Sequence, residues 1–317
     1  MKTPARVSAA SSLTESIGAT WTRFWFTPAG PWPLAVVRIL GGLLALALWA
    51  SYAGDLETWF GPFGMISPAL LGAWRSPYAV SLFDLTTSSA GLAVAYGLGG
   101  LVLVAVTIGL ATPVTTVLGA IAFAAILHRG PMLVGPADDV VAVILWCLAI
   151  GRSGDSLSVD RQVNAWRGRS APRPSVRTRI ALGLLQVHAA VIAGAAAIAQ
   201  LKGDVWWNGT AAWWLASRDE SPLVDLTGVF LQSEYLMNLV THAIVVFEIV
   251  FAAGLWFRAV RRPLVLTGVV AWPLIGLVAG EPFWGLALAV LSVGCWPPDS
   301  APGTESEATS VLFPPIG

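Results

Sequence analysis

Charged residues are scarce in this chain. Asp, Glu, Lys and Arg make up 11% of its 317 residues, whereas a soluble domain usually carries about 25%. Apolar residues supply 56%, and the mean hydropathy is +0.72. This composition excludes an ordinary soluble domain and predicts a polytopic membrane protein. The net charge of zero also argues against a nucleic-acid partner.

Cysteine and histidine are nearly absent. The two cysteines, Cys147 and Cys295, lie in apolar runs, so we expect neither a disulfide framework nor a thiolate metal site. The three histidines lie on different segments without the HxH or HxxxH spacing of metal ligands, and we expect no metal site. The chain also lacks Gly-x-Ser-x-Gly, a phosphate-binding glycine loop and CxxC, which argues against soluble-type hydrolase and nucleotide chemistry.

Both ends of the chain lack long apolar runs. Residues 1–20 are polar and do not resemble a signal peptide. Aromatic residues from Trp21 to Phe26 predict an interfacial helix within a cytoplasmic N-terminal segment, 1–31. Residues 297–317 are rich in Pro, Ser and Glu and predict a disordered cytoplasmic tail. The transmembrane domain is expected between them, at 32–296.

Long apolar runs fill that domain. A helix needs about 17–25 residues to cross a bilayer. We therefore expect an all-α bundle of about eight transmembrane helices, in which the third, fourth and eighth are short. The expected spans are Pro33–Ala53, Ala90–Leu110, Pro113–Leu127, Asp139–Ile150 with its flanks, Arg179–Ala199, Asn238–Phe257, Pro263–Gly280 and Pro282–Trp296.

Basic residues are divided unevenly between the two sides of such a bundle. With eight spans, the N-terminal segment, residues 151–179 and the turn at 258–262 share one side and hold thirteen of the eighteen Lys and Arg residues. The positive-inside rule makes that side cytoplasmic. We expect a multi-pass plasma-membrane protein in the lipid bilayer, with both termini cytoplasmic. The seven arginines of 151–179 are explained as a topology signal, and binding of lipid headgroups is the alternative interpretation.

Two long connections, 54–89 and 200–237, face the opposite side. Both are too apolar and aromatic for solvated loops, so we expect interfacial or re-entrant segments. Irregular backbone at that depth must be buried in protein or line a cavity, which predicts a cavity that opens outward. The chain shows no internal repeat and no matching pair of broken helices, and this disfavours a transporter built from inverted repeats.

Ionisable residues within spans are costly and mark candidate sites. Arg38 lies in the first expected span and Glu248 near the middle of the sixth. Glu248 shares one helical face with Asn238, Thr241 and Val245, which gives that helix a polar stripe. One interpretation is a structural pair, in which Arg38 approaches Glu248 or both contact Thr241. The other is a site for a polar ligand.

Two carboxylates, Asp138 and Asp139, stand at the start of the fourth expected span. Adjacent residues on a helix point about 100° apart, so at most one of the two faces the bundle. Carboxylates at a helix start also stabilise the positive end of its dipole. The position favours capping, and acid/base chemistry remains the alternative.

The segment Gln200-Leu-Lys-Gly-Asp-Val-Trp-Trp-Asn-Gly-Thr-Ala211 follows an apolar run. Its paired Trp and its Asn-Gly suit a tight turn at the membrane surface. It resembles the signature of the vitamin K-dependent γ-carboxylase-like (HTTM) family, approximately Lys-Leu-x-Gly-x-x-Trp-Trp-Asp/Asn-Gly-Thr-Ala. Further elements match in order: Arg38-Ile-Leu-Gly-Gly42, Phe60-Gly-Pro-x-Gly64, His128–Asp139, Gly151-Arg152 with Ser156-Leu-Ser-Val-Asp160, Gln186 and Glu248.

The resemblance implies a membrane bundle with a ligand site. In the family's carboxylases, oxygenated reduced vitamin K removes a γ-proton from a peptide Glu before CO₂ is added. The implied cofactor is therefore reduced vitamin K or another quinone, and the implied partners are a quinone or a peptide. The implied ligand-binding residues are Arg38, Gln186, Gln200, Trp206, Trp207, Asn208 and Glu248.

The chain departs from the carboxylase pattern in three respects. Gln200 replaces the Lys regarded as the catalytic base, the Asp138-Asp139 region replaces a His, and the large lumenal domain is expected to be absent. Lys202 lies about 200° away on a helix and substitutes only where the backbone is irregular. We expect a family member without γ-carboxylation; an interaction or peptide-maturation partner, or a transporter, is the alternative. If the chain is an enzyme, the catalytic candidates are Lys202, Asp138, Asp139 and Glu248.

Overall fold

The computed structural model describes residues 9–66, 68–76, 79–218 and 225–297. In this part of the chain the regular structure is helical, apart from an isolated bridge between Ala29 and Ser175. The expected class, a helical membrane protein, is confirmed at this level. Six helices here are long and apolar enough to cross a membrane: α2 (Trp32–Ser51), α5 (Ser89–Ile108), α6 (Thr112–Arg129), α9 (Val176–Gln200), α13 (Glu234–Gly254) and α14 (Arg258–Ala279).

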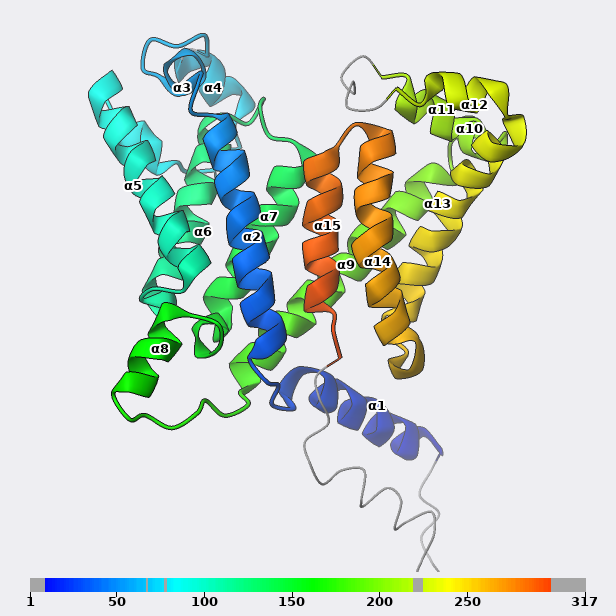
Figure 1. Ribbon diagram of the computed structural model, residues 1–317, viewed down its shortest axis with the longest axis horizontal. Helices are drawn as coiled ribbons and strands as arrows, with labels where there is room; N and C mark the ends of the chain where they lie inside the picture. Colours follow the sequence, from blue (N-terminus) through cyan, green and yellow to red (C-terminus); the bar gives the residue numbers. More distant parts are fainter. Residues whose placement is uncertain (1–8, 67, 77–78, 219–224, 298–317) are drawn as a thin grey trace, which may run out of the picture.

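Two shorter helices, α7 (Pro136–Ile150) and α15 (Pro282–Gly294), join the bundle (Figure 1). Each of the eight expected spans overlaps one of these eight helices. The expectation that the third span is short is wrong, because α6 begins one residue earlier and continues through His128 and Arg129 to 18 residues. The 13 residues of α15 extend about 20 Å at 1.5 Å per residue, which is less than the roughly 30 Å of a bilayer's hydrocarbon core.

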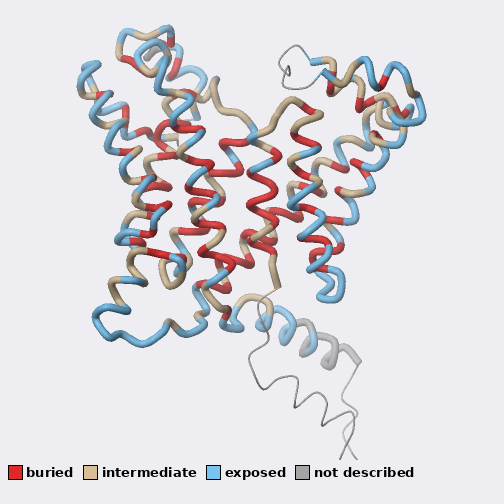
Figure 2. The backbone as a smooth tube through the Cα atoms, in the orientation of Figure 1, coloured by how far each residue is buried: buried red, intermediate tan, exposed pale blue. Residues whose placement is uncertain are grey.

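Buried residues gather in the middle of the bundle (Figure 2), where α15 contacts α2, α7, α9 and α14. Helices α14 and α15 approach each other closely. A Cβ atom on Gly285 would lie 2.5 Å from the Trp272 carbonyl oxygen, and one on Gly276 would lie 2.8 Å from the Gly285 Cα. Small residues thus admit the short helix to the core, as expected for packing between membrane helices.

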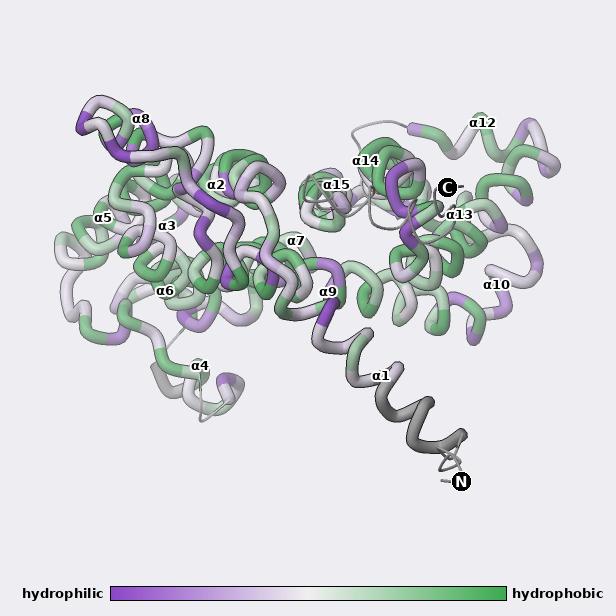
Figure 3. Tube along the Cα trace, turned by 90° about the horizontal axis from the view of Figure 1, so that it is seen from below, coloured by the Kyte–Doolittle hydropathy of each residue, from purple (hydrophilic) through white to green (hydrophobic). Residues whose placement is uncertain are grey.

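Short helices and connections cover the two ends of the bundle (Figure 1). One end, here called the arginine end, carries α1 (Ala9–Phe26), η2 (Ser153–Asp155) and α8 (Val159–Trp166). Seen from this end, α1 extends away from the bundle (Figure 3). The opposite end, here called the far end, carries α3 (Leu56–Phe60), α4 (Pro68–Trp74), η1 (Leu82–Leu85), α10 (Asp204–Trp207), α11 (Ala211–Ala216) and α12 (Thr227–Gln232).

The two long connections therefore fold into short helices at the same end, in agreement with their expected shared side. The N-terminal aromatic segment is helical, as predicted, and its Trp21 and Phe26 are exposed. The predicted disordered tail falls on residues that the structure does not describe, except for Pro297, and stays a prediction.

Candidate functional site

Arg38 is completely buried and points from α2 to the end of α5. Its Nη1 donates to the carbonyl oxygens of Val106 and Thr107, both at 3.0 Å, and its Nη2 donates to that of Leu157 at 2.6 Å. The first two carbonyls belong to the last turn of a helix, where orphan acceptors and the negative dipole end favour a cation. Arg38 thus connects α2, α5 and the segment before α8.

The expected approach of Arg38 to Glu248 is wrong. Arg38 uses backbone carbonyls, while Glu248 accepts from a residue of α9. Thr241 is not shared either, because its hydroxyl bonds Gly209 and Ala212. The physical reason is that carbonyl oxygens at the end of α5 and before α8 lie within reach of Arg38, and a helix's C-terminal end favours a cation.

Asp160 lies in the first turn of α8. Its carboxylate oxygens accept from the N–H groups of Ala111 at 2.8 Å and Thr112 at 2.6 Å, at the start of α6. The Asp160 N–H donates to the Gly109 carbonyl at 3.0 Å. The turn between α5 and α6 is therefore held on its carbonyl side by Arg38 and on its N–H side by Asp160, each with the charge that the helix end favours.

The Trp-Trp-Asn-Gly-Thr-Ala segment forms a tight turn docked on α13. Gly209 has a φ of +72°, and a Cβ there would collide with the Asn238 side chain. Thr241 is buried; its hydroxyl donates to the Gly209 carbonyl and accepts from the Ala212 N–H, both at 3.0 Å. Glycine is needed for its left-handed backbone and for the close approach. The predicted polar stripe of α13 is the surface that receives this turn.

Gln200 and Glu248 form a polar pair between α9 and α13. Glu248 is fully buried, and its Oε1 accepts from Gln200 Nε2 at 3.1 Å. Glu248 Oε2 and Gln200 Oε1 are also buried, and neither has a hydrogen-bond partner among the described residues. An unsatisfied buried polar group costs about 1–3 kcal/mol. The pair can supply both donors and acceptors to a third group, and it is the strongest candidate site.

Gln186 lies elsewhere on α9. It stands fourteen residues before Gln200, about 21 Å along the helix axis. Its Nε2 donates to the Leu255 carbonyl at 3.0 Å, and Arg261 Nε donates to the same oxygen at 2.7 Å. The two side chains therefore satisfy a carbonyl at the end of α13, and Gln186 is not part of the Gln200–Glu248 site.

Asp138 caps α7, as its position favoured. Its Oδ2 accepts from the Gly135 N–H at 2.9 Å and its Oδ1 accepts from the Tyr52 hydroxyl at 2.8 Å. Asp138 is buried and Asp139 is exposed, so only one of the two faces the bundle, as predicted. Sequence reasoning missed Tyr52; its place at the end of the first span was the available signal.

Lys202, Trp207 and Asn208 are exposed at the far end. The helix ends before Lys202, so the irregular backbone that a substitute base requires is present, yet the Lys202 side chain faces outward. Trp207 Nε1 donates to the Leu201 carbonyl at 2.8 Å, and Trp206 is half-buried against the core. Of the predicted site residues, Gln200 and Glu248 are the two whose side chains are joined by a hydrogen bond in the described part of the structure.

Hydrogen bonds and ion pairs of charged side chains hold the connection 54–89 in place. The sequence did not indicate these side chains. Arg129 Nε donates to the Phe60 carbonyl at 3.1 Å, and Arg129 Nη1 lies 3.2 Å from an Asp84 oxygen. Arg75 pairs with the other Asp84 oxygen at 2.7 Å. A Cβ on Gly130 would come 2.6 Å from the buried Phe60 ring. The Phe-Gly-Pro-x-Gly turn is thus part of the far-end packing.

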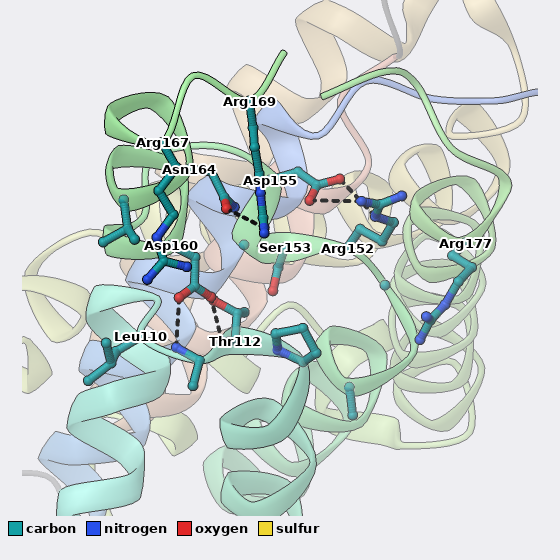
Figure 4. A pocket seen from close by; sticks show the side chains of 16 residues that line it. Leu110, Thr112, Arg152, Ser153, Asp155, Asp160, Asn164, Arg167, Arg169 and Arg177 are labelled. Atoms are coloured by element: carbon teal, nitrogen blue, oxygen red, sulfur yellow. Dashed lines mark hydrogen bonds and ion pairs between the residues drawn. The ribbon is translucent and has the colours of Figure 1, made fainter. Parts of the chain in front are cut away.

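A cavity of about 660 Å³ opens at the arginine end, beside the α5–α6 turn and α8 (Figure 4). Asp160 points into it from one side, while Arg152 and Asp155 pair at 2.9 Å on the other. The expected cavity was on the opposite face, near Gln200, and stays a prediction.

Comparison of the chain with protein-family models, curated proteins and solved structures gives no match. The resemblance to the HTTM family therefore rests on the ordered motifs. Among the described residues, no group of three His, Cys, Asp or Glu side chains could hold a metal ion.

Proposed function

We propose that this chain is an eight-span plasma-membrane protein of the HTTM type that binds a quinone-class ligand at the Gln200–Glu248 pair. It does so without γ-carboxylation. The observation that carries the proposal is the pair of buried oxygens, Glu248 Oε2 and Gln200 Oε1, that have no partner among the described residues.

The arrangement of the helices supports the count of eight. Along the chain, the six long helices and the two short ones run alternately toward the far end and toward the arginine end (Figure 1). The arginine-rich segment 151–179 and the start of α14 lie together, so the positive-inside rule makes the arginine end cytoplasmic. The short α15 is surrounded by longer helices that shield it where the bilayer exceeds its length.

Labelling of single cysteines tests this topology. In a Cys147→Ala, Cys295→Ala background, Asp204→Cys at the far end should react with a membrane-impermeant maleimide on intact cells. Ser170→Cys at the arginine end should react only after permeabilisation. Labelling of Ser170→Cys from outside would invert the orientation, and equal labelling of both positions would require a different number of spans.

The chemistry of the pair favours a quinone or quinol. A carboxyl within a span is tolerated when it is neutral, paired or beside water. In the neutral form, Glu248 donates a hydrogen bond that a quinone carbonyl accepts, and Gln200 Oε1 accepts one from a quinol hydroxyl. The rings of Phe247, Phe251 and Trp272 pack together on α13 and α14, with centroids 5.0–5.5 Å apart. Phe247 and Phe251 lie within three residues of Glu248 on α13, and an apolar ring with polar substituents suits aromatic and polar residues so placed.

Binding to the purified protein tests the ligand class. The full chain in detergent should bind vitamin K quinone or its reduced form in a titration followed by calorimetry. Glu248→Met and Gln200→Leu should each weaken binding on the order of tenfold or more, because each removes a buried polar partner. Glu234→Gln is the control, since Glu234 lies exposed on the same helix. Undiminished binding in both site variants, or none in the wild type, would favour a protein-interaction role instead.

The absence of γ-carboxylation has its own test. Gln200 cannot take up a proton at neutral pH, and Lys202 is exposed. The wild type should therefore add no CO₂ to a Glu-containing peptide in the presence of reduced vitamin K. Incorporation above a protein-free control that Lys202→Ala abolishes would make Lys202 the base.

A further inference from the structure

Four arginines converge at the arginine end where α1 meets the bundle. Arg23 comes from α1, Arg179 from the first turn of α9, and Arg258 and Arg261 from the first turn of α14. They line a cavity of about 220 Å³ whose described lining contains no Asp or Glu. Thr20, Phe24, Thr27 and Trp256 complete that lining.

Two of these guanidinium groups are held in place by backbone carbonyls. Arg179 Nε donates to the Phe24 carbonyl at 2.5 Å, and its Cζ lies 5.0 Å from the centroid of the Phe24 ring. Arg261 Nε donates to the Leu255 carbonyl at 2.7 Å. Both side chains are more than nine-tenths buried. Bonds at Nε fix the planes of the guanidinium groups and leave their terminal nitrogens for a ligand.

The helices add positive potential to the cluster. Both α9 and α14 begin at this end, and neither carries an acidic residue in its first turn. Basic side chains at the positive end of a helix dipole are unfavourable, and four like charges around one cavity repel each other. An anion in the cavity reverses both effects, and planar guanidinium groups match phosphate oxygens in pairs.

The cavity differs in this respect from the larger one beside α8. There Arg152 pairs with Asp155, Arg169 bonds Asn164 and Arg177 bonds a carbonyl of α7. The smaller cavity has positive charge alone in its described lining, and it adjoins the exposed aromatic residues Trp21 and Phe26 of α1. Such residues place α1 at the level of lipid headgroups.

We propose that Arg23, Arg179, Arg258 and Arg261 form a binding site for a phosphate group. The group belongs either to the headgroup of an anionic phospholipid of the cytoplasmic leaflet or to a soluble phosphate, since both present the same oxygens. This site is independent of the proposed quinone site, which lies at the other end of α9.

The experiment uses the full-length protein in phosphatidylcholine nanodiscs, with or without phosphatidic acid, and native mass spectrometry to count retained lipid. A second arm adds inorganic phosphate to nanodiscs of phosphatidylcholine alone and measures thermal unfolding. Arg258→Gln tests the site because the Arg258 side chain lines the cavity and is exposed, so its replacement should leave the fold intact. Arg262→Gln is the matched control: it is exposed on the same turn, removes the same charge and does not line the cavity.

The wild type should retain phosphatidic acid or be stabilised by phosphate, and Arg258→Gln should weaken that effect on the order of tenfold. Arg262→Gln should remain within about twofold, since an exposed charge contributes little. Without either anion, Arg258→Gln should unfold at the same or a higher temperature, because it relieves repulsion. Retention of lipid alone identifies the headgroup, and a response to phosphate alone identifies the soluble ion. Equal losses in the two variants, or no response in either arm, would overturn the site.

Discussion

Arg38 and Glu248 are both ionisable, completely buried and located within long apolar helices, yet their surroundings differ. The two terminal nitrogens of Arg38 make three hydrogen bonds to carbonyl groups, and only its Nε lacks a partner. Glu248 has a single hydrogen bond, from Gln200, and its second oxygen has none among the described residues. Arg38 thus bonds groups of the fold itself, whereas Glu248 keeps one buried oxygen that a further group could bond.

The difference shows that an ionisable residue in a span can be structural or functional, and that its partners decide which. At the α5–α6 turn, Arg38 and Asp160 bond helix-end groups, among them the Thr107 carbonyl and the N–H groups of Ala111 and Thr112, that helical hydrogen bonds do not satisfy. At the α9–α13 interface, the unpaired atoms belong to the side chains themselves. If removal of Arg38 and removal of Glu248 changed stability equally, the two residues would not differ in role.

The largest effect is expected for Arg38→Met. This substitution strands the carbonyls of Thr107 and Leu157 and leaves that of Val106 with only the Gly109 N–H, so the free energy of unfolding should fall by about 3–5 kcal/mol. Equilibrium unfolding of the purified protein in mixed micelles measures it. Lys202→Met, which removes an exposed cation, should change stability by less than about 0.5 kcal/mol. Similar values for the two variants would contradict the structural role of Arg38.

Thr241→Val should have the next largest effect. The shape of the side chain is kept, but the Gly209 carbonyl and the Ala212 N–H lose their buried partner. A loss of about 1–3 kcal/mol is expected, together with faster hydrogen exchange in the 206–212 turn. Thr241→Ser, which keeps the hydroxyl, is the control. An unchanged exchange rate at Ala212 in the valine variant would show that the turn does not depend on α13.

Asp160→Ala should cost about 1–2 kcal/mol because it uncaps α6. Asp155→Ala is the control: Asp155 lies nearby but pairs with the exposed Arg152. The difference between the two variants in thermal unfolding isolates the cap. If Asp155→Ala is equally costly, the α5–α6 turn does not rely on Asp160.

The positions of the helices could be predicted because the signals are local. Apolar runs, the prolines that begin α6, α7 and α15 and the glycines after α5 and α14 all lie within or beside the element they define. The capping role of Asp138 could be predicted for the same reason, because Asp138 lies in the first turn of the helix that it caps.

The partners of buried polar residues could not be predicted, because they depend on which helices face each other. Arg38 bonds carbonyls 68, 69 and 119 residues away, and no periodicity in α2 records that choice. The contact between Gln200 and Glu248 spans 48 residues. Resemblance put both residues in a site, and the structure shows that they touch.

The smallest effect on stability is expected for Glu248→Gln, in contrast to Arg38→Met. An amide keeps the shape of the side chain and its hydrogen bond from Gln200, while the cost of burying a carboxylate disappears. Stability should therefore change by less than about 1 kcal/mol or increase, although ligand binding weakens. Unfolding in micelles and quinone titration of the same preparation separate the two outcomes.

A double-mutant cycle then tests whether the two residues are independent. Because Arg38 and Glu248 bond different groups, the effects of Arg38→Met and Glu248→Gln should add to within about 0.5 kcal/mol. If the double variant were more stable than Arg38→Met alone, the result would instead support an ion pair between Arg38 and Glu248. Additivity together with a selective loss of quinone binding in Glu248→Gln would leave Arg38 to the fold and Glu248 to the ligand. A carboxyl that can be removed without loss of stability is retained for something other than folding.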